Sequence, residues 1–365
     1  MAWLIFLSPA TSVQADIAPE SVGITTLDAP RPTWFFAKGI DGSANLFDAA
    51  TGEMLGLLSL TPWTPAVLPN PRRGEIYAAE TYYSRGVRGD RSDVLTVYAG
   101  DTLAPVHEIE LPAKIAAVLP FRHYIALLDD DRHLAVFNMT PAQSVSIVDI
   151  ETRRFVGEIS TPGCALLLPS PDRAFLMLCG DGTLQLLRLD RSGQEAARLR
   201  SAPFFDVETD PVFDRPVAVP QGWLLASYEG NVFEVTVRGN DIVVGEPWSL
   251  LDDADREAGW RIGGAQLMAH HAGLDLMVVL AHVGEIDTHE EPGTEAWVID
   301  RQAQRRIARI TLPGPTMGVH ITPTADPLLV AAERGGPLHV YDLRSTRLLR
   351  SIAEPGVDAL TLQGF

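Results

Sequence analysis

The chain has 365 residues, of which 46% are hydrophobic and 21% charged, the composition of a globular protein with a large core. Its formal net charge is −18 and it has no basic run, so its electrostatics oppose binding to nucleic acid or to an anionic membrane. The length allows two or three average domains. Large all-β folds of this size often form one unit, and we expect a single domain over 33–365.

The N-terminal segment 1–15 resembles the apolar and cleavage regions of a secretory signal. It contains no charged residue, and Val13-Gln14-Ala15 is typical of a small-residue cleavage site. The basic first part of such a signal is missing, so the start codon is either misassigned or the signal is degenerate. We expect an exported protein with an N-terminal arm over 16–32. The alternative is a buried N-terminal strand in a cytosolic protein.

A repeated motif indicates the fold class. An alternating apolar run, usually ending near Asp, is followed by a turn and a second apolar run. Its seven copies, about 41 to about 64 residues apart, begin with the runs 45–48, 94–98, 144–149, 183–190, 231–237, 296–300 and 338–342. A propeller blade takes about 40–50 residues, so the repeat predicts an all-β, seven-bladed β-propeller. The alternative is a pair of β-sandwiches.

Three arginines, Arg85, Arg88 and Arg91, lie close to Asp90 and Asp93. The favoured interpretation is an ion-pair network that rigidifies a loop or contacts a partner subunit, because arginine binds carboxylates in a bidentate way. The alternative is a site for an anionic ligand.

The only two cysteines, Cys164 and Cys179, flank a predicted hairpin. Two apolar runs surround the turn formers at 169–173, and the midpoint falls between Pro171 and Asp172. Because both cysteines are equally far from that midpoint, we expect them to be cross-strand partners at a separation that suits a disulfide, provided that no bulge shifts the register. We therefore predict a Cys164–Cys179 bridge. The alternative is two reduced cysteines that pack as small hydrophobic side chains.

The segment 250–259 is polar and interrupts the repeat, and we expect a short helix or an extended loop there. Trp260 and Arg261 follow it. Both residue types are frequent at interface hot spots, so this pair is a candidate partner contact. A tryptophan that fills space between blades is the equal alternative.

Metal binding is a weak hypothesis at two places. His270 and His271 are neighbours on a predicted strand and point to opposite faces, which favours packing over a shared ion. The segment 282–291 holds two histidines and four carboxylates, but their spacing matches no standard metal motif. The chain also has no nucleophile elbow, phosphate loop or dinucleotide fingerprint. We predict no catalytic, cofactor-binding or metal-ligating residue in it.

Several segments resemble the heavy subunit of the periplasmic quinoprotein amine dehydrogenases, methylamine and aromatic amine dehydrogenase. They are the arginine-rich stretch 83–93, the cysteine pair with its Cys-Gly-Asp-Gly ending, the Gly-Trp-Arg-x-Gly-Gly stretch within 255–280, and His289 with the strand after it. The similarity runs from about Leu27 to the C-terminus.

This resemblance implies a seven-bladed propeller that binds a small light subunit in a two-plus-two heterotetramer in the periplasm. The light subunit would carry tryptophan tryptophylquinone and oxidise a primary amine to an aldehyde and ammonia. Electrons would then pass to a small blue copper protein. The heavy subunit would contribute scaffold and part of the amine channel. Candidate interface or channel residues are Phe35, Phe36, Arg85, Arg88, Trp260, Arg261 and His289.

Cysteine content excludes the light subunit itself, which is small and densely cross-linked, whereas this chain has two cysteines. A second hypothesis stays open: a stand-alone exported propeller that acts as a binding module or as a hydrolase with its site on the central channel.

Overall fold

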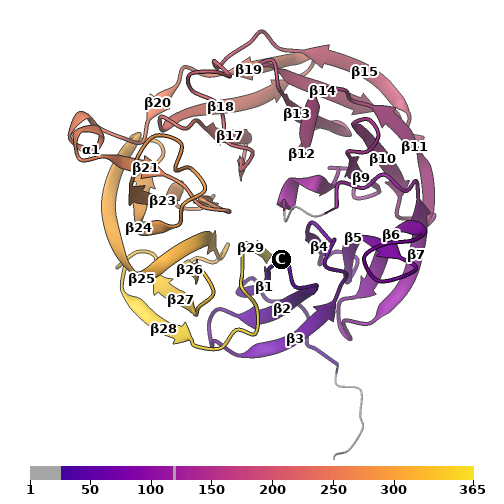
Figure 1. Ribbon diagram of the computed structural model, residues 1–365, viewed down its shortest axis with the longest axis horizontal. Helices are drawn as coiled ribbons and strands as arrows, with labels where there is room; N and C mark the ends of the chain where they lie inside the picture. Colours follow the sequence, from indigo (N-terminus) through magenta and orange to yellow (C-terminus); the bar gives the residue numbers. More distant parts are fainter. Residues whose placement is uncertain (1–25, 118–120) are drawn as a thin grey trace, which may run out of the picture.

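The computed structural model describes residues 26–117 and 121–365, and they form a ring of antiparallel sheets around a central axis (Figure 1). The predicted signal segment 1–15 and the first part of the predicted arm lie outside the described residues. None of the helices in the described part of the chain has the length and apolar character needed to cross a membrane. The prediction of an all-β propeller is confirmed.

Apart from the C-terminal strand β29, the strands of the first three sheets follow one another along the chain. The first is β29 (Thr361–Gly364), β1 (Trp34–Lys38), β2 (Ser43–Asp48) and β3 (Met54–Ser59). The second is β4 (Val67–Asn70), β5 (Glu75–Tyr83), β6 (Arg91–Ala99) and β7 (Pro105–Leu111). The 3₁₀ helix η1 (Arg122–Tyr124) leads to the third, which is β8 (Ile125–Leu127), β9 (His133–Asn138), β10 (Ser144–Asp149) and β11 (Arg154–Ser160).

The fourth sheet is β12 (Cys164–Ser170), β13 (Ala174–Cys179), β14 (Leu184–Leu189) and β15 (Glu195–Arg200). The fifth is β16 (Val217–Val219), β17 (Gly222–Ala226), β18 (Asn231–Arg238) and β19 (Asp241–Val244), with β20 (Trp248–Ser249) beside β18. After α1 (Asp253–Glu257), the last sheet contains β21 (Trp260–Ile262), β22 (Met268–His271), β23 (Leu276–Val283), β24 (Gly293–Asp300), β25 (Arg305–Ile321), β26 (Leu328–Glu333), β27 (Leu338–Asp342) and β28 (Leu348–Ile352).

The prediction of seven separate blades is wrong, because the structure has five separate blade sheets and one continuous sheet of eight strands. The cause is the long strand β25. Its first half pairs with β24 and its second half pairs with β26, so hydrogen bonding continues between the last two repeat motifs. Figure 1 shows β23 and β24 followed around the ring by β26 to β28.

Burial along the strands explains why the sequence forms stacked sheets. Every residue of β9 and β10 is buried, because a neighbouring sheet covers each face of these middle strands. The outer strand β11 is mostly exposed or half-buried. Apolar clusters therefore fill the spaces between adjacent sheets, including one that joins the third, fourth and fifth sheets.

The ring closes where the C-terminal strand β29 pairs with β1. The buried side chain of Gln266 fixes this closure. Its Nε2 donates to the carbonyls of Val319 and Leu362 at 2.8 and 3.0 Å, and its Oε1 accepts from the Leu362 amide at 2.9 Å. One glutamine thus ties β29 to β25.

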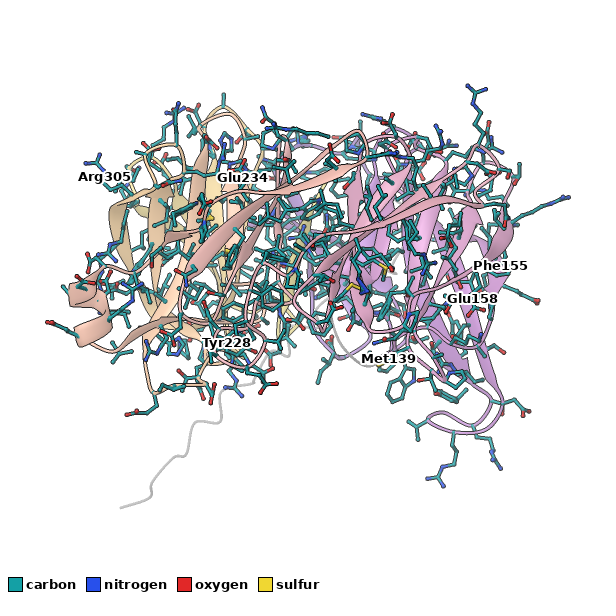
Figure 2. The ribbon with its side chains drawn as sticks, turned by 90° about the horizontal axis from the view of Figure 1, so that it is seen from above. Met139, Phe155, Glu158, Tyr228, Glu234 and Arg305 are labelled. Carbon is teal, nitrogen blue, oxygen red and sulfur yellow. A yellow bond between two sulfur atoms is a disulfide. The ribbon has the colours of Figure 1, made fainter. Side chains whose placement is uncertain are left out.

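Because the strands within each sheet are antiparallel, successive connections alternate between the two ends of the ring. One end, here called the long-loop face, carries the connections 39–42, 60–66, 84–90, 112–117 with 121–124, 139–143, 161–163, 180–183, 201–216, 227–230, 284–292, 334–337 and 353–360. The other end, the turn face, carries 49–53, 71–74, 100–104, 128–132, 150–153, 171–173, 190–194, 220–221, 239–240, 272–275, 301–304, 322–327 and 343–347. In Figure 2, Met139 and Tyr228 mark the long-loop face, and Arg305 lies toward the turn face.

The predicted disulfide is confirmed: Cys164 and Cys179 are bonded and are cross-strand partners with Cα atoms 4.0 Å apart. The hairpin itself is less symmetric than predicted. Its turn occupies 171–173, and the register shifts by one residue between Ala165 and Leu168. Leu166 adopts φ 68° in this bulge. The bulge adds one residue to β12 and so compensates for the three-residue turn. Cys164 and Cys179 therefore still lie opposite each other.

The segment 250–259, where we expected a short helix or an extended loop, contains the short helix α1. Asp252 caps it, accepting from the Asp255 amide at 2.8 Å, while the Asp255 side chain accepts from the Asp252 amide. This capping box satisfies amides that a helix this short would otherwise leave unpaired.

Candidate interaction face

Exposed apolar side chains are distributed unevenly over the molecule. Fourteen large apolar residues are exposed in the described part of the chain, and none lies in a connection of the turn face. Half of them lie in outer strands. The others lie in the long-loop connections or at the strand ends beside them: Ile40, Tyr82, Val87, Met139, Val207, Val283 and Ile286. Apolar side chains collected at one end of a protein are typical of an interaction surface.

The tip of the β5–β6 hairpin is one part of this face. Arg85 and Arg88 are exposed on either side of Val87, which is 66% exposed. Neither arginine has a carboxylate within 4 Å among the described residues. The predicted ion-pair network forms only at its other end, where Arg91 binds Asp93 at 2.8 Å. Asp93 also accepts from the Ile115 amide at 2.7 Å, which anchors the base of the hairpin.

A hollow of about 190 Å³ lies elsewhere on the same face. Three connections and strand β21 line it, and they bring Arg261 and His289 together with Tyr228. The ring of His289 stacks on Tyr228 with centroids 4.0 Å apart, and Phe213 packs edge-on at 5.9 Å. The Gly264 amide donates to the His289 carbonyl at 3.1 Å, which fixes the loop that carries this histidine.

The hollow has a mixed charge. Glu208, Glu229 and Asp287 line it together with the single cation Arg261. Burial raises the pKa of Tyr228, and the nearby carboxylates of Asp214 and Glu290 raise it further. The phenol therefore stays protonated at neutral pH. The hollow offers an aromatic wall, one guanidinium and a carboxylate rim, which suits contact with a polar surface.

The remaining predicted interface residues, Phe35, Phe36 and Trp260, are buried or half-buried. Phe35 and Phe36 are fully buried in β1 in the isolated chain, and their place at a channel or interface stays a prediction. Phe36 instead packs on Phe365, with ring centroids 5.6 Å apart. Trp260 packs on Trp297 at 5.4 Å, and the Arg309 guanidinium lies 4.4 Å from its ring centre. Trp260 is half-buried and packs against an apolar cluster, which is consistent with the alternative of a tryptophan that fills space between blades.

Three of the four histidines in the two weak metal hypotheses have a hydrogen-bond partner of their own, and the fourth, His289, stacks on Tyr228. His270 Nε2 binds Asp275 at 2.9 Å, and His271 Nε2 donates to the Thr324 carbonyl at 2.9 Å. His282 Nε2 pairs with the Thr288 hydroxyl at 2.9 Å. Within 26–117 and 121–365, no three metal-ligating side chains gather.

The sequence did not identify Tyr228 and Asp287 as residues of the hollow, or Phe213 as the residue that packs behind His289. Asp287 fell within the acidic segment 282–291 that drew attention as a metal site. Tyr228 and Phe213 carry no local signal, because they meet His289 only through the packing of three separate connections.

The turn face is built differently. Its connections are short, and polar groups on them bind the next sheet around the ring. These contacts join Arg73 to Asp131, Arg153 to Glu75, Arg301 to Glu234, Arg188 to Asn240, and the amides of Asp172 and Arg173 to Asp129. The turn face therefore satisfies much of its charge within the chain.

The closed ring of antiparallel sheets defines this chain as a β-propeller protein, and one face of it presents apolar side chains and a hollow to the exterior. The family model described as "Methylamine dehydrogenase heavy chain (MADH)" matches residues 38–362. The chain belongs to the methylamine dehydrogenase heavy chain family.

Curated relatives support this assignment. The methylamine dehydrogenase heavy chain of Paracoccus versutus is 28% identical over 319 residues, which cover 85% of this chain and 73% of the relative. That of Methylophilus methylotrophus is 27% identical over 281 residues, 76% of this chain and 69% of the relative.

Two solved structures share the fold alone. A functionally unknown protein from Desulfotomaculum acetoxidans has a TM-score of 0.62 at 11% identity, covering 90% of this chain and 96% of that one. Dihydro-heme d1 dehydrogenase NirN, solved in complex with DHE, has a TM-score of 0.54 at 15% identity, covering 94% of this chain and 78% of that one.

Proposed function

We propose that this chain is the noncatalytic heavy subunit of a periplasmic amine dehydrogenase and that its long-loop face binds the light subunit. The observation that carries the proposal is the asymmetry between the faces. Apolar side chains are exposed at the long-loop face, whereas groups on the turn face bind one another. Burying such a patch against a partner is favourable, at about 25 cal/mol per Å² of apolar surface.

In this role the light subunit carries out the amine oxidation, and this chain binds the light subunit. On the light subunit, tryptophan tryptophylquinone would supply the oxidation of a primary amine to an aldehyde and ammonia. The residues of this chain would bind that subunit and exclude water around it. Arg85, Val87 and Arg88 would contact it from the hairpin tip, and Arg261 and His289 from the hollow. A two-plus-two heterotetramer and a small blue copper protein as electron acceptor complete the proposal.

Isolation of the tagged chain from its native host tests this function. The expected result is co-purification with a small, cysteine-rich subunit that has quinone absorbance, together with amine-dependent reduction of a dye. The purified chain alone should reduce no dye. A stable monomer from a host that makes the light subunit, or amine oxidation by this chain unaided, would contradict the proposal and favour a stand-alone propeller.

A matched pair of variants locates the contact. Arg88→Glu reverses a charge on the hairpin tip, and Arg344→Glu does the same on the turn face. We expect Arg88→Glu to weaken recovery of the light subunit at least tenfold, because the hairpin tip is free to contact a partner. Arg344→Glu should leave recovery unchanged. Equal losses in both variants would argue against the long-loop face.

A further inference from the structure

A small cavity lies toward the ring axis, separate from the hollow on the long-loop face. Its volume is about 20 Å³, and its lining includes Phe121, Arg122, Asp214, Arg215, Gln266 and Thr361. These residues come from η1, the connection 201–216, the segment before β22 and the closing strand β29. A space of this size holds one or two water-sized groups.

Arg122 is the unusual residue of this cavity. It is mostly buried, and the hydrogen bond that fixes it runs from Nε to Gln363 Oε1 on β29 at 2.9 Å. No carboxylate lies within 4 Å of its guanidinium in the described ranges, and the adjoining segment 118–120 has no acidic residue in its sequence. Burial lowers the pKa of Arg122 to about 10, so it still carries its charge at neutral pH.

The other charged groups around the cavity do not balance this charge. Arg215 forms an ion pair with Asp214, and its guanidinium carbon lies 4.1 Å from the centre of the Phe121 ring. Burial, with the nearby Arg122 charge, lowers the pKa of both His123 and His320 to about 3, so both are neutral. Two guanidinium groups and one carboxylate leave one positive charge in a chain of net charge −18.

A buried cation without a counter-ion costs free energy, because it loses hydration without gaining a partner. A small anion removes that cost. We propose that Arg122 binds a small monovalent anion, the size of chloride, in this cavity. Because Arg122 also holds Gln363 of β29, the bound anion would stabilise the closure of the ring.

Bromide is the probe, because it resembles chloride and scatters anomalously. Crystals of the full chain grown in sodium bromide should show an anomalous peak within hydrogen-bonding distance of the Arg122 guanidinium. Thermal unfolding gives the solution test. At ten times the dissociation constant, bromide should raise the Tm by about 2 °C over a halide-free buffer of equal ionic strength.

Two variants separate specific binding from general salt effects. Arg122→Gln should lose the bromide-dependent rise in Tm. Arg344→Gln removes an exposed arginine of the turn face and should keep the rise. An equal rise in Arg122→Gln, or a crystal peak without any solution effect, would overturn the proposal. If Arg122→Gln does not fold, the absence of a wild-type peak at Arg122 would overturn it. Both bromide tests use this chain alone, so their results are independent of whether it binds a light subunit.

Discussion

The two ends of the ring differ in how they use their side chains. On the turn face, arginines such as Arg301 and Arg153 reach across to carboxylates on the next sheet. On the long-loop face, Ile286 and Val87 are 69% and 66% exposed, and Arg85 and Arg88 extend from a hairpin tip. The contrast indicates that one end stabilises the ring and the other is available to a partner.

The disulfide lies at the long-loop end of β12 and β13, where fewer ion pairs cross between sheets. Replacing Cys164 and Cys179 with serine together should lower the free energy of unfolding by about 3 kcal/mol, because the unfolded chain regains a loop of about 15 residues. Urea unfolding measures the loss. The reduced wild-type chain is the control and should show a similar loss. A change below about 1 kcal/mol would mean that other contacts hold this blade.

Ile286→Glu places a charge at the hollow of the proposed contact. We expect it to raise the Kd for the light subunit about 100-fold, equivalent to about 2.7 kcal/mol. Titration calorimetry measures the affinity. Val106→Glu is the control, because Val106 is 59% exposed but lies in the outer strand β7. Comparable losses in both variants would show that the face has no special role.

Arg301→Met removes a cation of the turn face that binds Asp275 at 2.6 Å and Glu234 at 2.9 Å. The free energy of unfolding should fall by about 1–2 kcal/mol, because two carboxylates lose their partner in a partly solvated site. Light-subunit affinity should not change. A loss of affinity with unchanged stability would reverse the roles that we assign to the two faces.

Contacts on the turn face should also make the stability of the fold depend on pH. Burial alone would raise the pKa of Asp149, but hydrogen bonds from Arg132 and the Thr152 amide outweigh it and lower the pKa to about 2. The pKa of Asp149 in the folded chain is below the usual carboxyl value near 4. Its ionised side chain therefore stabilises the fold above about pH 4, and this stabilisation is lost as the pH falls toward 2. Asp149→Asn should cost about 1 kcal/mol at pH 6 and less at pH 3, measured by urea unfolding.

Local sequence patterns predicted most of the fold. Alternating runs located the strands, and the symmetric placement of Cys164 and Cys179 predicted their bond even though a bulge and a three-residue turn alter the hairpin. The number of separate sheets was wrong because β25 joins the sheets of the last two motifs, and no local pattern distinguishes one long strand from two.

The candidate site was harder to predict because it depends on packing between distant segments. His289 and Arg261 were found one at a time, and only the fold brings them to Tyr228 in one hollow. Phe35 and Phe36 were expected at the channel or interface because the resemblance assigns the aromatic channel lining to this region, and in the isolated chain they are completely buried. An apolar run alone does not tell an exposed aromatic residue from a core residue.

Hydrogen exchange on the native complex, compared with the isolated chain, tests the central claim most directly. Binding of the light subunit should slow exchange in the connections 84–90, 139–143 and 284–292 and leave 171–173 and 301–304 unchanged. Protection confined to the turn face, with 84–90 and 284–292 exchanging as in the free chain, would contradict the account.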